Sequence, residues 1–255
     1  IAQLSALVGL DQISTENNGI TLTTSNGAVL VDGGSSFALQ TTLVGGNTDV
    51  VSSTGQDVTT GLTGGQLGGV LEARDQQIPA YASALDNLAY AIGTQVNTQN
   101  EAGLDGNGNP GAALFTLTPT ATGAAAAIQV ATSDPSAVAA AAVGEGTSGN
   151  GNATALSDLS SAALVGGQTA DGFYAALLSQ IGNDAAGATT DNTAQQATLT
   201  QLTSQRDSSS AVSLDEEASN LTEYQRSYQA AAKMFTIADT LMADALNLGV
   251  QSAVS

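Results

Sequence analysis

One stretch of the chain has the residue spacing of a metal loop, and it reads Asp105-Gly106-Asn107-Gly108-Asn109. Calcium loops of the EF-hand type begin with oxygen ligands at this spacing, followed by Gly at the sixth position and a bidentate Glu at the twelfth. Here the sixth position is Pro110 and the twelfth is Thr116. Because Asp and Asn side chains also hydrogen-bond turns of their own backbone, we interpret the stretch as an Asx-rich turn. No metal or cofactor is predicted.

A second group of residues that could do chemistry is the acidic triplet Asp215, Glu216 and Glu217. Paired carboxylates act as general acid and base when a scaffold holds a substrate between them. The chain has no His and no Cys, so the commonest general base and the thiolate nucleophile are missing. Negative charge is favoured in the first turn of a helix, and we interpret the triplet in that way. We therefore expect no catalytic residues and no enzyme activity. A hydrolase that uses carboxylates alone is the enzymatic alternative.

The charge balance excludes several classes of partner. There are 23 Asp and Glu residues against 4 Lys and Arg, which gives a formal net charge of -19. Such a surface repels phosphate backbones and anionic headgroups, so neither nucleic acid nor a membrane is an expected partner. No run approaches the roughly 20 apolar residues that a membrane-spanning helix needs.

The elements that position these residues begin with a β-rich segment. In residues 20–42 the β-branched side chains flank Asn26-Gly27, which predicts a hairpin because both residues tolerate positive φ. We expect loops in residues 43–65, with a short strand near 49–52. The next segment predicts a long amphipathic helix over 66–96, bent near Pro79. Its expected inward stripe is Leu67, Leu71, Arg74, Ile78, Tyr81, Leu85, Leu88 and Ile92.

The region after this helix is predicted to be mixed and then helical. Asp134-Pro135-Ser136 favours a short helical turn, since Pro suits the first helical position. Further helices are expected at 154–164, 169–181 and 191–206. In the second of these, Thr169 is the expected cap, and the expected inward residues are Phe173, Tyr174, Leu177, Leu178 and Ile181.

The most regular pattern runs from Leu214 to Leu248, where apolar residues recur every seven positions in two rows. This spacing predicts a helix of roughly 50 Å with one apolar stripe, capped by Ser213. Aromatic residues at helical spacing usually belong to a core or an interface, and small alanines allow close helix approach. The candidate assembly residues are Leu214, Leu221, Tyr224, Tyr228, Ala231, Phe235, Ala238, Met242 and Ala245.

These patterns predict a mainly α fold with minor β, in which long antiparallel helices form a bundle or coiled coil beside a small β-hairpin region. The expected segments are a β-hairpin-rich part after a short helix (1–65), a long helix with a Gly/Asn loop (66–111), a small mixed segment (112–152), a helical segment (153–210) and a C-terminal heptad helix for axial assembly (211–255).

The heptad helix resembles the C-terminal helix of bacterial flagellar axial proteins, and within them the hook-associated protein 1 family. The shared elements are the opening Leu-Asp-Glu-Glu at 214–217, Tyr224-Gln225 and Tyr-Gln-Ala-Ala-Ala at 228–232. Residues 64–115 resemble an internal helix of that family with its Gly-x-Asp-x-x-Gly loop closing on Leu-Phe, and residues 170–186 resemble the helix before its terminal section. The family's N-terminal part has no counterpart here, so we expect this chain, which begins at Ile1, to be the C-terminal portion of a longer protein.

The resemblance implies a structural subunit outside the cell, at the junction between hook and filament of the bacterial flagellum. It implies a ring of identical subunits that contacts the hook protein and the second junction protein or filament. It also implies an export chaperone that binds the C-terminal helix, and pairing of that helix with an N-terminal helix as a coiled coil. An adhesin-type surface protein with a helical stalk is the non-enzymatic alternative; it predicts regular β repeats, which the sequence lacks.

Overall fold

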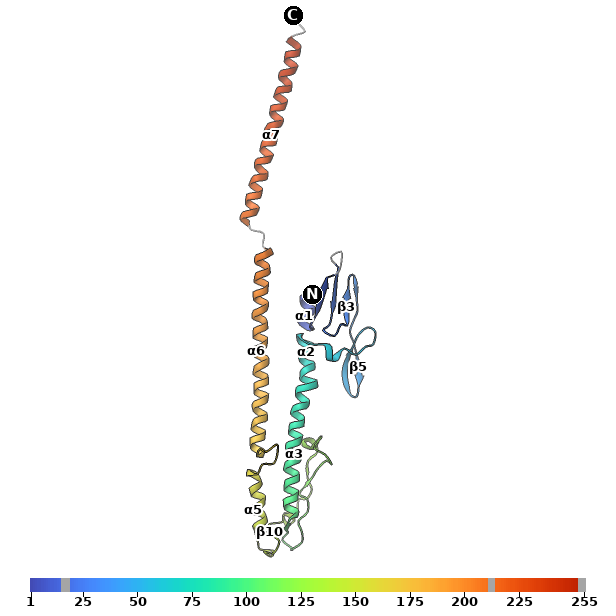
Figure 1. Cartoon of the computed structure of the whole chain (residues 1–255), viewed down its shortest axis with the longest axis vertical. Helices are drawn as coiled ribbons and strands as arrows, with labels where there is room; N and C mark the ends of the chain where they lie inside the picture. Colours follow the sequence, from blue (N-terminus) through green and yellow to red (C-terminus); the bar gives the residue numbers. More distant parts are fainter. Residues whose placement is uncertain (15–18, 211–213, 252–255) are drawn as a thin grey trace. The chain divides into compact units, whose positions relative to one another are not determined.

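The computed structural model describes residues 1–14, 19–210 and 214–251 (Figure 1). Long helices dominate and the strands are short and antiparallel, which confirms the predicted mainly α class with minor β. The chain divides into two compact units, Ile1–Gly182 and Asn183–Ser255, which are described separately below as the first and second unit. Among the described residues, no helix is long and apolar enough to cross a membrane.

The strands of the first unit form small antiparallel sheets. The first sheet has the order β1-β2-β3-β4, and the others pair β5 with β6, β7 with β10 and β8 with β9. Their bounds are β1 Asp11–Ser14, β2 Ile20–Thr23, β3 Val29–Asp32, β4 Ser35–Ser36, β5 Gln40–Val44, β6 Asn47–Val51, β7 Gly103–Leu104, β8 Phe115–Thr116, β9 Gln129–Val130 and β10 Ala141–Ala142.

The predicted hairpin is confirmed as β2 and β3, which pair with Thr21 opposite Asp32. Gly27 adopts a φ of 84° in the connecting turn, and its N–H donates to the Thr24 carbonyl over 2.8 Å. The strand expected near 49–52 is β6. The expectation of a loop at residues 43 and 44 is wrong, because these residues end β5, which pairs with β6. The turn between the two strands consists of Gly45 and Gly46, both at positive φ.

The hydrophobic core of the first unit lies where these sheets meet the first two helices, α1 (Ala2–Leu7) and α2 (Gly65–Glu72). A 3₁₀ turn, η2 (Thr59–Gly61), leads into α2. Burial of aliphatic side chains stabilises this region by removing apolar area from water. The buried cluster consists of Val8, Leu30, Val50, Val58, Leu62 and Leu71.

The long helix predicted over 66–96 is present and extends from α2 through a π-helical turn, η3 (Ala73–Gln77), into α3 (Ile78–Glu101). Pro79 has no N–H that could donate to the carbonyl four residues earlier. The wider π-helical turn η3 lies just before this proline. The expected inward stripe is wrong at two positions, since Ile78 is 60% and Leu85 is 40% exposed. Periodicity places these side chains on the apolar stripe, but the described elements of the first unit leave them exposed.

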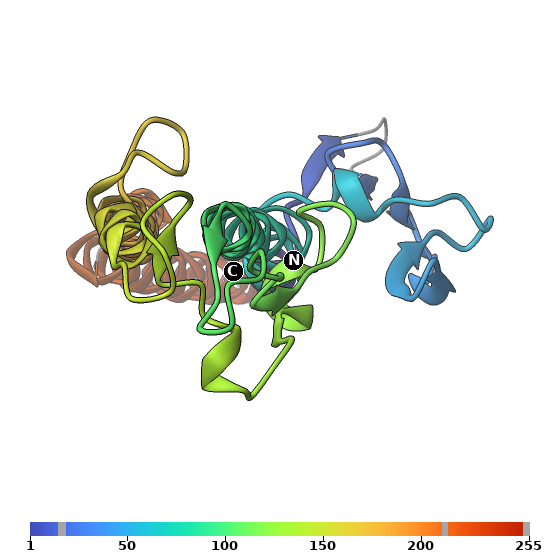
Figure 2. The ribbon, with the colours of Figure 1, turned by 90° about the horizontal axis from the view of Figure 1, so that it is seen from below.

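The segment after α3 is a set of turns held to that helix by polar side chains. Figure 2 shows these turns, of residues 103–150, beside α3. The Asp86 carboxylate accepts from the Gly123 and Ala125 N–H groups at 2.7 and 2.9 Å. Asn97 accepts from the Leu114 and Phe115 N–H groups, both at 2.9 Å. The helical pieces of this segment are α4 (Ala124–Ala127), η4 (Pro135–Ala137), α5 (Gly151–Asp158) and η5 (Leu159–Ser161).

The two helices predicted at 169–181 and 191–206 are a single helix, α6 (Ala170–Ser210). Gly182 and Gly187 weaken a helix by only about 1 kcal/mol each, and no Pro interrupts this stretch, so they do not end it. Thr169 caps α6 as predicted, because its hydroxyl accepts from the Gly172 N–H at 3.1 Å. The next long helix is α7 (Leu214–Gln251). Its expected cap, Ser213, lies outside the described residues.

Candidate assembly surface

The nine candidate assembly residues all belong to α7. The described helix runs from Leu214 to Gln251, and it has neither Pro nor an internal Gly before residue 249. Side chains seven residues apart lie nearly above one another on an α-helix, so the two rows form one continuous stripe. The side chains of Leu214 and Ala245 lie outside the part that the structure describes.

The stripe on α7 is exposed along its described length. Tyr224, Tyr228 and Phe235 are 74%, 78% and 75% exposed, and Leu221, Ala231, Ala238 and Met242 are exposed as well. Large apolar side chains scattered singly over a surface are ordinary, whereas a continuous stripe of them marks a surface that another molecule or segment covers. The described part of α7 therefore presents a continuous, exposed apolar stripe.

A second exposed row on α7 was missed by the sequence reasoning. It consists of Met234, Ile237 and Leu241, which are 72%, 57% and 64% exposed. These residues also follow a three- and four-residue spacing, but they are out of phase with the first stripe and begin only halfway along the helix. A search for a second period on the same helix would have found them.

The charges on α7 are acidic as a whole, because its 38 residues hold six Asp and Glu against two Arg and Lys, and only its middle stretch is balanced. Between residues 218 and 243 the acidic residues are Glu223 and Asp239, and the basic residues are Arg226 and Lys233. The net charge of this stretch is therefore zero, although the chain carries -19.

The loop with metal-like spacing is an Asx turn, as predicted. The Asp105 carboxylate accepts from the N–H groups of Asn107 and Asn109 at 2.9 and 2.7 Å. The bond from the Asn109 N–H is the main reason why the pKa of Asp105 lies below its ordinary value. No group of three or more metal-ligating side chains occurs among the described residues.

In the acidic triplet, Glu217 is exposed on the first turns of α7, and the side chains of Asp215 and Glu216 lie outside the part that the structure describes.

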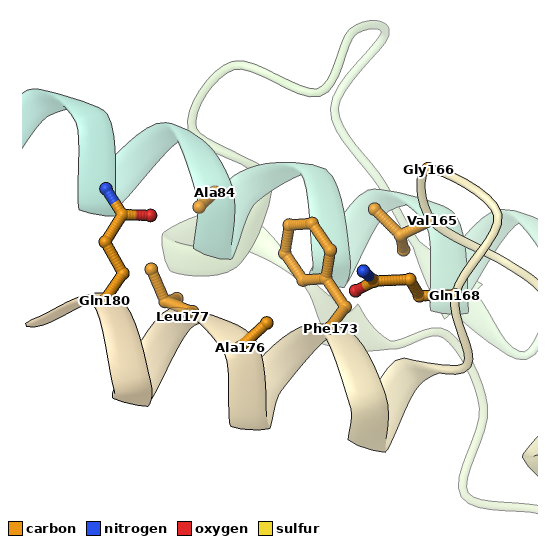
Figure 3. A pocket seen from close by; sticks show the side chains of 8 residues that line it. All are labelled: Ala84, Val165, Gly166, Gln168, Phe173, Ala176, Leu177 and Gln180. Carbon is orange, nitrogen blue, oxygen red and sulfur yellow. The ribbon is translucent and has the colours of Figure 1, made fainter.

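A pocket of about 220 Å³ lies within the first unit, between α3 and the first turns of α6 (Figure 3). These turns run antiparallel to α3, with Leu177 pointing toward it and buried (Figures 1 and 3). The expected inward positions Tyr174 and Leu178 are wrong, because both are exposed on another face of α6. The pocket walls hold amide groups but no charged side chain, and consist of Ala84, Val165, Gly166, Gln168, Phe173, Ala176, Leu177 and Gln180.

Two family models match separate parts of the chain. Residues 1–115 match the flagellar hook-associated protein FlgK helical domain, and residues 203–248 match the flagellar basal body rod FlgEFG protein C-terminal model. The first match includes the β-rich core, α2 and α3. The second includes most of α7 and the exposed stripe described above.

Relatives with the same name occur in several bacteria. Flagellar hook-associated protein 1 of Salmonella typhimurium is 40% identical over 95 residues, which are 37% of this chain and 17% of the relative. Its counterpart in Escherichia coli is 32% identical over 127 residues, which are 46% of this chain and 23% of the relative. The solved flagellar hook junction protein FlgK of Burkholderia pseudomallei is 33% identical and covers 46% of this chain and 23% of that one, with a TM-score of 0.41.

The matches thus span less than a quarter of the relatives' own length. They nevertheless agree with each other, because the family model at residues 1–115 and the curated relatives carry the same family name. The model at residues 203–248 describes a flagellar C-terminal segment and falls on the helix that carries the heptad pattern. Together these matches support a member of the flagellar hook-associated protein 1 family.

Proposed function

We propose that this protein is a structural subunit of the bacterial flagellum, outside the cell at the junction between hook and filament, and that it assembles through α7 without catalysing a reaction. The observation that carries the proposal is the exposed heptad stripe of α7, which lies in the segment matched by the flagellar rod C-terminal model. The family membership supplies the flagellar context.

The stripe suits pairing with one other helix in a coiled coil. Each large apolar side chain of the stripe, such as Leu221 or Phe235, would insert between four side chains of the facing helix. The small Ala231 and Ala238 would let the two backbones approach closely. Covering a large side chain such as Phe235 contributes about 1.5–3 kcal/mol. The partner that we propose is an N-terminal helix of the kind that the resemblance implies for subunits of this family.

The proposed partners follow from the family and from the charge of the chain. We propose a ring of identical subunits that contacts the hook protein on one side and the second junction protein or filament on the other. An export chaperone would cover the apolar stripe of α7 before assembly, since an exposed stripe invites aggregation. The net charge of -19 opposes binding to nucleic acid or to anionic membranes.

Two Asp substitutions on the stripe test whether α7 is the assembly element. Leu221→Asp with Phe235→Asp places charge in the proposed seam, so incorporation into flagella is expected to fall by more than tenfold and motility to be lost. The matched control is Thr222→Asp with Thr236→Asp, which adds the same charge one residue further along, at exposed positions beside the stripe. Incorporation is measured by immunoblot of isolated hook and filament material.

The folding of the first unit provides the control for this test. Because Leu221 and Phe235 lie in the second unit, the doubly substituted chain should keep the unfolding transition of Ile1–Gly182. Equal incorporation of both double variants would show that the stripe is not an assembly surface. Collapse of the whole chain in the Leu221 and Phe235 variant alone would show that the stripe belongs to a core.

Hydrogen exchange gives an independent measurement on the unsubstituted protein. Single helices gain most of their stability from tertiary packing, so the amides of residues 214–248 are expected to exchange rapidly in the free chain. On assembled hooks the same amides are expected to become protected. Strong protection already present in the free chain would contradict the proposal that assembly covers this helix.

A further inference from the structure

The described residues contain three Asn-Gly pairs, at positions 26–27, 107–108 and 150–151. Such pairs are prone to spontaneous deamidation, because glycine has no Cβ that would shield its nitrogen from the preceding side chain. In this reaction the Gly nitrogen loses its proton and attacks the Asn amide carbon. A C–N bond forms, and the side-chain nitrogen takes up a proton and leaves as ammonia. Water then opens the cyclic imide to aspartate or isoaspartate, so the rate depends on how readily the Gly N–H loses its proton.

The pair at 150–151 differs from the other two in the group that accepts from its Gly N–H. The Gly151 N–H donates to Oε2 of the Glu145 carboxylate at 2.9 Å. The N–H groups of Gly27 and Gly108 donate instead to neutral backbone carbonyls, at 2.8 and 3.0 Å. A negative charge on the acceptor stabilises the proton on the nitrogen. The Gly151 amide is therefore the hardest of the three to deprotonate.

The turn itself fixes the Glu145 carboxylate at this position. The Ala142 N–H donates to the same oxygen at 3.1 Å. A Cβ on Gly149 would lie 2.5 Å from Oε2, and a Cβ on Gly151 would lie 2.6 Å from Oε1. The carboxylate thus lies directly against the backbone at both glycines, where no larger residue would leave room for it.

The side chain of Asn150, in contrast, is exposed and is not used as a cap. Asn150 is the N-cap residue of α5, a position at which an Asn side chain usually accepts from an N–H of the first helical turn. Here it makes no capping bond to α5, whose residues 151–158 are all described. The amide carbon is therefore open to attack, and the bond from Gly151 to Glu145 is what opposes the reaction.

We propose that Asn150-Gly151 is a latent deamidation site of this protein, and that the Glu145 carboxylate keeps it unmodified by accepting the Gly151 N–H. Isoaspartate at position 150 would add one methylene to the backbone directly before α5. The buried Asn152 on α5 accepts from the Gln99 side chain at 2.7 Å and donates to the Ala139 carbonyl at 2.6 Å. Modification of Asn150 would therefore displace the residue that attaches α5 to α3.

Peptide mapping by mass spectrometry tests this proposal on the full chain and reads all three Asn-Gly pairs in one sample. The chain is incubated at mildly alkaline pH, both folded and in urea. In the unsubstituted chain, Asn150 is expected to deamidate about tenfold more slowly when folded than in urea.

The variant Glu145→Ala is expected to raise the rate at Asn150 in the folded chain about tenfold, as loss of a hydrogen bond to a charged group implies. The rates at Asn26 and Asn107 should stay unchanged. The matched control is Glu72→Ala, which removes an exposed carboxylate from α2 and should change none of the three rates.

Two results would overturn the proposal directly: an unchanged rate at Asn150 in Glu145→Ala, or equal rates for the unsubstituted chain folded and in urea. A parallel rise at all three pairs would report unfolding of that variant. Glu145→Gln then decides, because it keeps the shape of the side chain and removes its charge. In that variant a rise at Asn150 alone supports the proposal, and no rise overturns it. The proposed assembly function is untouched by any of these results, since they involve no contact of α7.

Discussion

At the scale of single residues, amide side chains hold the turns of the first unit to α3. Asn100 is fully buried; its amide donates to the Ala112 carbonyl at 2.7 Å, and its oxygen accepts from the Ala139 N–H at 2.9 Å. Asn100→Ala would leave buried backbone groups without partners, which costs about 1–3 kcal/mol for each. We expect the free energy of unfolding of the first unit to fall by about 2–4 kcal/mol, measured by urea denaturation with the m-value recorded.

The control for this substitution lies on the same helix. Gln95 is exposed on α3, so Gln95→Ala removes a side-chain amide of similar chemistry from a solvent-facing position. Its effect should stay within about 0.5 kcal/mol. Similar losses for the two variants would mean that the contacts of Asn100 contribute little to the stability of the first unit.

Glu145 makes the stability of the same region depend on pH. Its carboxylate accepts from the Gly151 N–H at 2.9 Å and from the Ala142 N–H at 3.1 Å. The bond from Gly151 is the main reason why the pKa of Glu145 lies below its ordinary value of 4.5. Because the folded pKa is the lower one, the stabilisation is present above pH 4.5 and is lost as the pH falls through the folded value.

The variant Glu145→Gln isolates this charge. The melting temperature of the unsubstituted chain is expected to exceed that of the variant at pH 7, and the difference should close as the pH drops below the ordinary glutamate pKa. Thermal unfolding followed by circular dichroism at a series of pH values measures it. A difference that stays constant from pH 7 to pH 3 would assign the effect to shape rather than to charge.

At the scale of elements, neighbouring glycines in α2 have opposite roles. A Cβ on Gly68 would lie 2.9 Å from the Thr63 carbonyl carbon and 3.0 Å from the Leu62 oxygen, both of which are backbone atoms. A Cβ on Gly69 would meet nothing within 4 Å. We expect Gly68→Ala to lower the free energy of unfolding by about 1–3 kcal/mol, and Gly69→Ala to raise it by about 0.5–1 kcal/mol through helix propensity. Stabilisation by both substitutions would show that α2 shifts freely against the preceding turn.

The sequence predicted those elements whose local pattern determines them. The Asn26-Gly27 hairpin, the long helix through α3 and the heptad helix α7 were found because turn chemistry and apolar periodicity act over short distances. Strand β5 was missed because Gln40 to Val44 is exposed and lacks alternation, so only its pairing with β6 identifies it. Tyr174 and Leu178 were placed inward because apolar character shows that a side chain can be buried, but not which face of α6 meets α3.

The candidate assembly surface lies on one helix as predicted, and its role in assembly stays a prediction. Its nine residues follow from a seven-residue repeat on one helix, which needs no knowledge of tertiary contacts. The second row was not predicted, because Met234, Ile237 and Leu241 fall between the positions of the dominant repeat. Whether either row is covered depends on other chains, and no pattern within this sequence identifies those partners directly.

At the scale of the whole molecule, the charge of -19 opposes the association that we propose for α7. Added salt screens repulsion between copies, with a Debye length of about 30 Å at 0.01 M and about 8 Å at 0.15 M, while apolar contacts are little affected. We therefore expect self-association of the chain to strengthen as NaCl rises from 10 to about 300 mM. In static light scattering the second virial coefficient should fall from positive toward zero or below. Sucrose at matched osmolality is the uncharged control and should leave the coefficient near its low-salt value. A coefficient that rises with salt would mean that ion pairs such as Glu223 with Arg226 of another copy, rather than the apolar rows, hold the copies together.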